Sequence, residues 1–177
     1  MDGLNFDPQA IAGVVLVRAK PVPDERGSFG RIYDASSFAA AGLPTECVQE
    51  SVSRNVRAGT LRGLHGTIER HAESKYVSCT RGSIFDVVVD ARVASPTYGK
   101  WMSIELSEDR DEQLFVPPGC LHGFQTRVDA TVVRYRMDRA FDGTAFVGAH
   151  YASPSLAIGW PLPPVAVSAR DLQLPNF

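Results

Sequence analysis

The chain has 177 residues, which suits a single globular domain, since domains cluster near roughly 100 to 200 residues. Its 18 Lys and Arg against 20 Asp and Glu leave a formal net charge of −2, which argues against a basic nucleic-acid-binding surface. We therefore expect one domain over residues 1–177, with no nucleic acid among its partners.

Neither a membrane span nor an export signal is expected. The apolar stretch Ile11–Val17 is far shorter than the roughly 18 residues that a spanning helix needs. Acidic Asp2 and Asp7 precede it, where a signal peptide would be basic. The three cysteines form an odd set without Cys-x-x-Cys spacing, which argues against a disulfide framework and a zinc knuckle. We expect a cytoplasmic protein that does not contact a membrane.

The first third of the chain predicts a strand, a turn and a helix. The short β-branched run 14–17 ends before a Pro-Val-Pro segment, which favours a strand. Residues 24–27 have the composition of a turn. The segment from Asp34 to Gly42 has an N-cap aspartate, strong helix formers and a terminal glycine, and it is the only segment in which the pattern predicts a helix.

The rest of the chain predicts one strand after another. Strands are expected over 75–80, 84–90, 101–106, 113–116 and 131–137. Turn signals separate them about every 10 to 15 residues, and 15 Gly and 12 Pro punctuate the chain. This spacing is typical of a β-sandwich or barrel.

One of these strands has two different faces. In the segment 84–90, Phe85, Val87 and Val89 form a wholly apolar face. The opposite face mixes aliphatic residues with Asp86 and Asp90. The mixed face is therefore a candidate lining for a cavity.

Two of the four histidines lie beside glycines in apolar surroundings. They are His65, in Leu61-Arg-Gly-Leu-His65-Gly, and His122, in Pro117-Pro-Gly-Cys-Leu-His122-Gly. A lone histidine of this kind is more often structural than catalytic. Arg62 lies three residues before His65, so a regular strand would point the two side chains to opposite faces. A kink at Gly63 is implied if both serve one site.

The two histidine segments resemble the paired motifs of the cupin superfamily. Metal-binding cupins have His-x-His followed by an acidic residue, because a divalent ion takes several imidazole and carboxylate ligands. Thr67 stands here at the second histidine position. His65, Glu69 and His122 are a weak alternative ligand set, and we expect no metal.

A more specific resemblance appears when the motifs are taken in order from about Asp24 to Pro175. They are Asp24-Glu-Arg-Gly-Ser-Phe29, Gln49, Gly59-Thr-Leu-Arg-Gly-Leu-His65, Ser74-Lys-Tyr-Val77, Gly82-Ser-Ile-Phe-Asp-Val-Val-Val-Asp90, Ser95-Pro-Thr-Tyr-Gly-Lys-Trp101, Pro118-Gly-Cys-Leu-His-Gly-Phe124, Tyr135 and Ile158-Gly-Trp-Pro161. In this order they resemble the dTDP-4-dehydrorhamnose 3,5-epimerase family. The resemblance implies an all-β cupin jelly roll with short peripheral helices, a homodimer, and neither metal nor other cofactor.

The resemblance also implies the chemistry and the residues that perform it. The family inverts carbons next to the ketone of a nucleotide-linked 4-keto-6-deoxyhexose, which needs a base, an enolate-stabilising group and an acid. By resemblance His65 is the base, Asp171 holds its other ring nitrogen, Lys75 stabilises the enolate and Tyr135 is the acid. The implied substrate contacts are Arg26, Phe29, Gln49, Ser51, Arg62, His122, Phe141 and Arg170.

The departures from the family pattern lie at the nucleotide end. Arg31 stands where a carboxylate is usual, and Gly66-Thr67 replaces Tyr-Gln after His65. Ala140, with Phe141 next to it, aligns with the aromatic residue that stacks on thymine, and Phe146 replaces an acidic residue. The catalytic positions are intact, so epimerisation is predicted, with a dTDP sugar as the favoured substrate.

Several alternatives remain open from the sequence. The enzyme could invert C3, C5 or both, as in the conversion of dTDP-4-dehydro-6-deoxyglucose to dTDP-4-dehydrorhamnose. It could instead be a 3,4-ketoisomerase acting on a related nucleotide sugar. From another class, it could be a cupin that binds a sugar nucleotide without catalysis.

Overall fold

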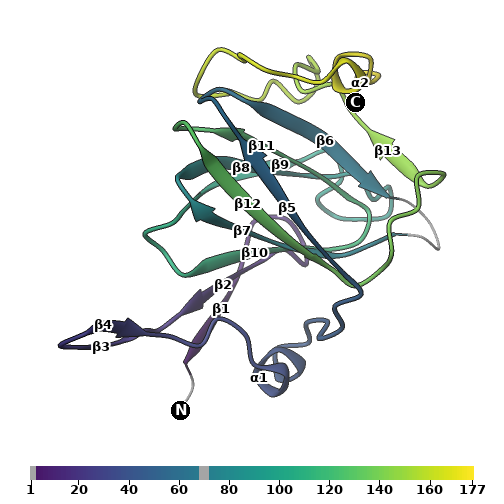
Figure 1. Ribbon diagram of the computed structural model, residues 1–177. Helices are drawn as coiled ribbons and strands as arrows, with labels where there is room; N and C mark the ends of the chain where they lie inside the picture. The colour runs from purple at the N-terminus through teal and green to yellow at the C-terminus, as the bar shows by residue number, and fades with distance from the viewer. Residues whose placement is uncertain (1–2, 68–71) are drawn as a thin grey trace.

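Two antiparallel β-sheets face one another in this computed structural model, which describes residues 3–67 and 72–177 (Figure 1). Within these residues the larger sheet has the order β1-β2-β10-β7-β12-β5, with β1 Leu4–Pro8, β2 Val15–Ala19, β5 Gln49–Asn55, β7 Lys75–Arg81, β10 Glu112–Val116 and β12 Thr131–Met137. The smaller has the order β13-β6-β11-β8-β9, with β6 Leu61–Thr67, β8 Ser83–Asp90, β9 Trp101–Ser107, β11 Cys120–Thr126 and β13 Phe146–Gly148. The predicted all-β jelly roll is confirmed.

The six expected strands are all present with ends within two residues of those predicted. Several strands were not expected, among them β1 and β13. In three others, β5, β6 and β11, glycines or alternating polar residues interrupt the apolar pattern that marks a strand. These three strands line the cavity described below. The pattern therefore failed where the protein places polar chemistry inside a sheet.

The expected helix is α1, Ala35–Ala40. The Asp34 side chain accepts a hydrogen bond from the backbone N–H of Ser37, and Gly42 follows the helix with φ of 72°. A second helix, α2 (Ala169–Leu172), was not predicted. Four residues are too few to display a helical period, although Ser168 caps this helix as Asp34 caps the first.

Apolar side chains cover both faces of the smaller sheet. Between the sheets, buried residues such as Leu16, Val77 and Phe124 form a core that faces the interior. On the outer face, Val87 and Val89 belong to a second cluster, against which Trp160 of the C-terminal segment packs. The apolar face predicted for β8 is thus the outer one, and its mixed face is turned inward.

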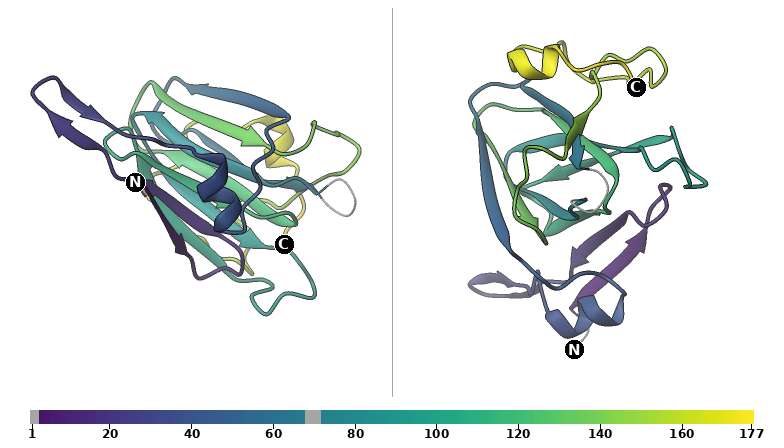
Figure 2. Two further views of the ribbon diagram at one scale, coloured as in Figure 1. Left: turned by 90° about the horizontal axis from the view of Figure 1, so that it is seen from below. Right: turned by 90° about the vertical axis from the view of Figure 1, so that its right-hand side faces the viewer.

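A two-stranded hairpin projects from the body of the molecule (Figures 1 and 2). It consists of β3 Val22–Asp24 and β4 Gly27–Phe29, joined at the turn that the sequence predicted. Phe29 is 81% exposed on it. The described part of its own chain therefore leaves most of this aromatic ring uncovered.

The cysteines and the helices relate to the expectations that the chain has no disulfide framework and no membrane span. Cys79 and Cys120 are buried, Cys47 is exposed, and all three are free thiols. Among the described residues, no helix has the length and apolar character needed to cross a membrane.

Candidate active site

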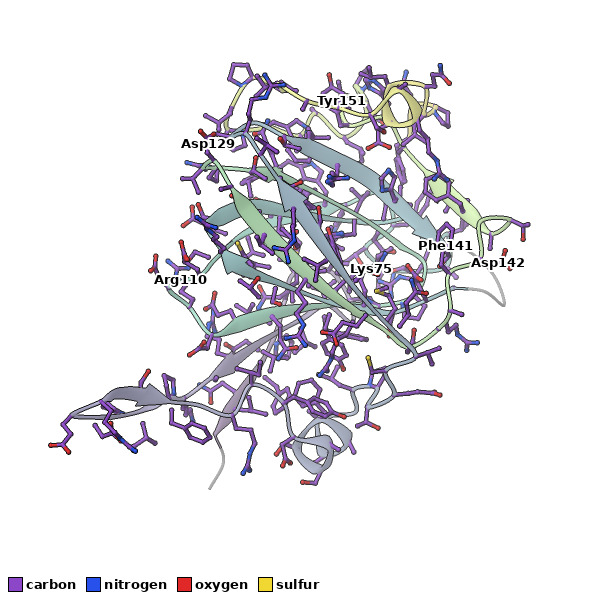
Figure 3. The ribbon with its side chains drawn as sticks, in the orientation of Figure 1. Lys75, Arg110, Asp129, Phe141, Asp142 and Tyr151 are labelled. Carbon is purple, nitrogen blue, oxygen red and sulfur yellow. The ribbon has the colours of Figure 1, made fainter. Side chains whose placement is uncertain are left out.

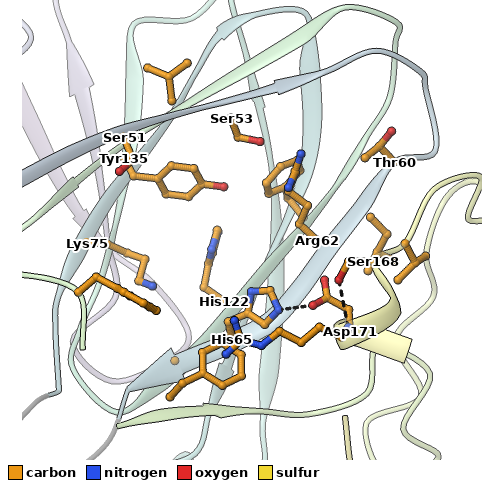
Figure 4. Close-up of a pocket in the computed structure, with 18 of the residues that line it drawn as sticks. Ser51, Ser53, Thr60, Arg62, His65, Lys75, His122, Tyr135, Ser168 and Asp171 are labelled. Carbon is orange, nitrogen blue, oxygen red and sulfur yellow. Dashed lines mark hydrogen bonds and ion pairs between the residues drawn. The ribbon is translucent and has the colours of Figure 1, made fainter. Parts of the chain in front are cut away.

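A cavity of about 750 Å³ lies between the two sheets, a size typical of small-molecule sites (Figure 4). Strands β5, β7 and β12 of the larger sheet form one wall, and β6, β11 and β13 of the smaller sheet form the other. The segment around α2 closes the rim beside β6. In Figure 3, Lys75 lies between the sheets and Phe141 lies toward their edge.

His65 and Asp171 meet in this cavity although 106 residues separate them. The C-terminal segment runs along the start of β6, where the backbone N–H of Leu61 donates to the carbonyl of Ala166. This pairing places α2, which carries Asp171, next to His65. His65 Nε2 lies 2.8 Å from Asp171 Oδ1. Asp171 Oδ2 also accepts a hydrogen bond of 3.2 Å from the N–H of Gly63. The carboxylate is therefore held from two sides and fixes the orientation of the imidazole.

A bulge in β6 brings Arg62 and His65 to the same face. His122 of β11 pairs with His65, but Phe124 pairs with Arg62, so three steps along β6 oppose two along β11. The extra residue lies at Gly63, whose φ is +125°. A Cβ on Gly63 would lie 2.6 Å from the Cα of Gly123, so the bulge requires glycine. The kink implied by the sequence is confirmed.

Burial and charge set the protonation of the His65–Asp171 pair. Burial lowers the pKa of His65, and electrostatic interactions with His122 and Lys75 act in the same direction, while the hydrogen bond to Asp171 opposes them. Burial alone would raise the pKa of Asp171, but hydrogen bonds from His65 and from the Gly63 N–H hold it below its usual value. The result is a neutral imidazole beside an ionised carboxylate, as a general base requires.

Tyr135 and Lys75 face His65 from the opposite sheet. In Figure 4 the phenol oxygen and the amine of Lys75 both point into the cavity. Burial raises the pKa of Tyr135 well above its usual value, and the nearby charge of Asp86 adds to this effect. Lys75 Nζ donates a 3.0 Å hydrogen bond to Glu73 Oε1, and both side chains are nearly buried. Glu73 was not predicted, although an acidic residue two positions before Lys75 shares its face of an extended chain.

A second histidine–carboxylate pair lies beside the first. His122 Nε2 is 2.7 Å from Oδ1 of Asp86, and both residues are buried. Burial raises the pKa of Asp86, while His122 and Lys75 oppose the rise. The ring of His122 meets the edge of Tyr135 at a centroid distance of 6.1 Å. Asp86 was missed as a site residue, and the signal was its place on the mixed face of its strand.

The other predicted contact residues lie in three places. Ser51, Arg62, Phe141 and Arg170 line the cavity. The amide oxygen of Gln49 accepts a 2.9 Å hydrogen bond from the N–H of Phe141, so it anchors the segment that carries this ring. Arg26 and Phe29 lie on the projecting hairpin, where Arg26 is paired with Asp24.

The alternative metal site rests on a residue that is not described. Among residues 3–67 and 72–177, no three His, Cys, Asp or Glu side chains are grouped closely enough to hold a metal ion. Glu69, the third member of that ligand set, lies outside the described residues. His65 and His122 are instead each bonded to a carboxylate.

Comparisons with known proteins identify the family of this chain. The family model for dTDP-4-dehydrorhamnose 3,5-epimerase matches residues 8–177. The dTDP-4-dehydrorhamnose 3,5-epimerase of Sinorhizobium fredii is 38% identical over 178 residues, which cover 100% of this chain and 91% of that protein. The dTDP-4-dehydrorhamnose 3-epimerase of Streptomyces niveus is 37% identical over 169 residues, covering 95% and 81%.

A solved structure is similar to this chain in fold as well as in sequence. The dTDP-4-dehydrorhamnose 3,5-epimerase of Bacillus anthracis, crystallised with TDP and PPi bound, has a TM-score of 0.94 at 33% identity and covers 98% of this chain and 99% of that one. Sequence and structure thus match over almost the whole length. The chain belongs to the dTDP-4-dehydrorhamnose 3,5-epimerase family, whose members are isomerases.

Proposed function

We propose that this protein inverts C3 and C5 of a nucleotide-linked 4-keto-6-deoxyhexose, as in the conversion of dTDP-4-dehydro-6-deoxyglucose to dTDP-4-dehydrorhamnose. The observation that carries the proposal is the opposition of His65 and Tyr135 across one cavity, from two different sheets. Inversion next to a ketone removes a proton from one face of the carbon and returns one to the other. A base and an acid on opposite walls match that requirement.

His65 is the base in this proposal. Its Nε2 is bonded to Asp171, which leaves Nδ1 to take the proton from the carbon next to the ketone. The nearby carboxylate then stabilises the imidazolium that forms. Because burial lowers the pKa of His65, the imidazole is neutral and ready at neutral pH.

Lys75 and Tyr135 complete the reaction. Loss of the proton places negative charge on the C4 oxygen, and the ammonium group of Lys75 stabilises this enolate. The Tyr135 phenol then gives its proton to the opposite face of the carbon. Its raised pKa keeps it protonated until the strongly basic enolate carbon accepts the proton. His122, oriented by Asp86, is placed to contact the sugar between these groups.

The nucleotide end of the substrate is assigned to the arginines and Phe141. The guanidinium groups of Arg62 and Arg170 suit a diphosphate because they bind two oxygens side by side. Phe141, 58% exposed at the pocket, offers its ring to a base. A relative crystallised with TDP and PPi supports a thymidine nucleotide, and we propose a dTDP sugar as substrate.

We propose further that the protein works as a homodimer. Arg26 and Phe29 lie on a hairpin that projects away from the body of their own chain (Figure 1). A second copy could receive this hairpin at its cavity, which would explain an 81% exposed Phe29. No metal or cofactor is required by this mechanism. Three free thiols are compatible with a reducing compartment, and we place the enzyme in the cytoplasm.

Solvent exchange tests the proposed activity. The protein is incubated in D₂O with dTDP-4-dehydro-6-deoxyglucose, and deuterium at C3 and C5 is followed by NMR. Deuterium at both carbons with inverted product supports a 3,5-epimerase, and deuterium at one carbon only would identify a single-site epimerase. A product with its ketone moved to C3 would identify a ketoisomerase. Binding without exchange at either carbon would overturn the proposed catalysis.

A further inference from the structure

Phe146 occupies an unusual place at the wall of the cavity. It is the first residue of β13, the edge strand that pairs with β6, and it lies opposite Thr67. Gly148 lies directly opposite His65. Side chains of Phe146 and His65 therefore emerge on the same face as diagonal neighbours, a separation that an aromatic ring can bridge. The family resemblance implies an acidic residue at this position, where this chain has an aromatic ring.

The ring of Phe146 contacts two groups of the site at once. Its centroid lies 5.2 Å from that of the His65 imidazole, with an angle of 49° between the planes. The guanidinium carbon of Arg170 lies 3.5 Å from the same centroid, which is close stacking of a cation on an aromatic ring. All three side chains line the cavity. One ring thus touches the base and an arginine assigned to the diphosphate.

We propose that Phe146 is a positioning residue that holds the base His65 and the anion-binding Arg170 in a fixed relation to each other. This inference rests on the roles of His65 and Arg170 in the proposed function. It gives a role to Phe146, which the sequence analysis noted only as a departure from the family pattern.

Stacking on Phe146 orients the Arg170 guanidinium toward an anion and leaves its N–H donors free to form hydrogen bonds. A guanidinium that lies flat on a ring keeps the N–H groups at its edge free, and these are the groups that bind two oxygens of a phosphate. The same contact restrains a long and flexible side chain before the substrate arrives, which reduces the entropy lost on binding. Arg170 precedes Asp171 in α2, so the stack also braces the helix that carries the partner of His65.

The contact with His65 has an electrostatic consequence. An apolar ring beside the imidazole keeps water away from it and disfavours the charged form, in line with the burial that lowers its pKa. Among the described residues, the titratable and charged groups that share the cavity with His65 are Asp171, Arg170, Lys75, Glu73, Arg54, Arg62, His122 and Tyr135, with Asp86 behind His122. A change from Phe146 to leucine removes none of these groups but releases Arg170, which the ring holds. The variant Arg170→Gln, which keeps the ring, therefore separates the effect of the ring on His65 from that of the guanidinium.

The test uses Phe146→Leu, with Phe146→Tyr as the variant that keeps a ring. Phe85→Leu is the matched control, because Phe85 also makes an aromatic edge contact in the same sheet, on the outer face against Trp160. The pKa of His65 is read from its imidazole signals by NMR, assigned with His65→Gln, and the affinity for TDP is measured by calorimetry. Neither measurement depends on turnover.

We expect F146L to raise the pKa of His65 toward its usual value and to weaken TDP binding about three- to tenfold. F146Y and F85L should leave both quantities as in the wild type. In kinetics, the acid limb of kcat/KM for F146L should move to higher pH, which a general loss of folded protein would not produce. A folded F146L with unchanged His65 titration and unchanged TDP affinity would overturn the proposal.

A second variant covers the case in which F146L does not fold. Arg170→Gln removes the guanidinium and keeps the ring, so TDP binding should weaken by a similar factor while the pKa of His65 changes little. Unchanged TDP affinity in R170Q would overturn the assignment of Arg170 as the stacked anion contact. Failure of the proposed function has a separate signature, since the wild type would then show no solvent exchange while these titrations could still be carried out.

Discussion

His65 and His122 are direct partners in the register of β6 and β11, and each binds a buried carboxylate through Nε2. Asp171 holds His65 from outside the sheet, while Asp86 holds His122 from the neighbouring strand β8. Burial acts to raise the pKa of both carboxyl groups, but the net shifts have opposite directions. The pKa of Asp171 is lowered by its hydrogen bonds, whereas that of Asp86 is raised by burial. Two pairs of the same composition are thus prepared for different roles.

Replacing Tyr135 by phenylalanine should separate proton removal from inversion. His65 can still take a proton in Y135F, but nothing supplies one to the opposite face, so exchange should continue while inverted product falls by roughly 10²-fold or more. The variant His65→Gln should lose both deuterium exchange and inverted product. The measurement is deuterium content against product stereochemistry by NMR. Tyr98→Phe, on the surface beside Phe177, serves as the control. Equal loss of exchange in Y135F and H65Q would contradict the assignment of separate acid and base.

Asp86→Asn should cost activity without costing stability at neutral pH. Asp86 has a folded-state pKa raised above the value of 3.8 expected in the unfolded chain. The folded state therefore binds the proton of Asp86 more tightly than the unfolded chain does. The stability that the protonated group contributes is complete below the pKa of the unfolded chain, and it is lost as pH rises through the pKa of the folded state. An asparagine avoids this loss and keeps an oxygen for His122. Thermal unfolding near pH 7.5 should give a Tm no lower than wild type, with kcat reduced about tenfold or more. A clear fall in Tm would show that the ionised carboxylate stabilises the fold.

Asp90→Asn should show the opposite dependence on pH. Burial would raise the pKa of Asp90, but bonds from Arg92, Ser95 and Thr97 outweigh burial and hold it far below its usual value. Stability from this group is present above the unfolded pKa near 3.8 and is lost as pH falls through the folded value. At pH 7, D90N should lower the free energy of unfolding by about 2–3 kcal/mol, because it weakens charge-assisted hydrogen bonds.

Urea unfolding at pH 7 and at pH 3 measures this effect for Asp90. The difference between D90N and wild type should shrink at the lower pH, where the unfolded chain binds the proton more readily. A difference of the same size at both pH values would mean that shape, and not charge, determines the role of Asp90.

Gly63→Ala should damage both the fold and the site. The new methyl group would lie 2.6 Å from the Cα of Gly123 and 2.9 Å from the carbonyl oxygen of His122, at a φ of +125°. We expect a loss of at least about 2 kcal/mol in stability and a large loss of kcat, because the bulge directs Arg62 and His65 to one face. Gly159→Ala, where the methyl group meets nothing within 4 Å, is the control for adding a side chain. Near-normal activity of a folded G63A would show that the bulge is not needed.

Mixing two inactive variants should test whether the hairpin serves a neighbouring copy. One variant carries Arg26→Glu on the hairpin, and the other carries His65→Gln in the cavity. If the hairpin of one chain completes the cavity of another, a mixed dimer has one intact site, and the mixture should recover roughly a quarter of wild-type activity after subunit exchange. A mixture as inactive as its components, in a sample proved to exchange subunits by mass spectrometry, would place Arg26 in its own chain's site. Full activity of the Arg26→Glu variant by itself would place Arg26 outside the site.

The family and the jelly roll were predictable because their signals are local. Strand after strand was marked by alternating side chains and by recurring Gly and Pro, and the helix at 35–40 by a cap at each end. The ordered motifs around His65, Lys75, His122 and Tyr135 indicated the chemistry of the family. Short or interrupted elements were not predicted, because a helix of four residues and strands that contain glycine show too little periodicity.

Only the tertiary structure decided which of these residues lie close to one another. The sequence by itself determined that His65, Asp171 and Tyr135 are present, but a strand of regular geometry would have turned Arg62 away from His65. The bulge at Gly63 brings them to one face, and the C-terminal segment carries Asp171 across 106 residues to the imidazole. Asp86, Glu73 and Phe146 joined the site for the same reason. Their roles come from contacts between distant strands, and the pattern along a single strand does not contain them.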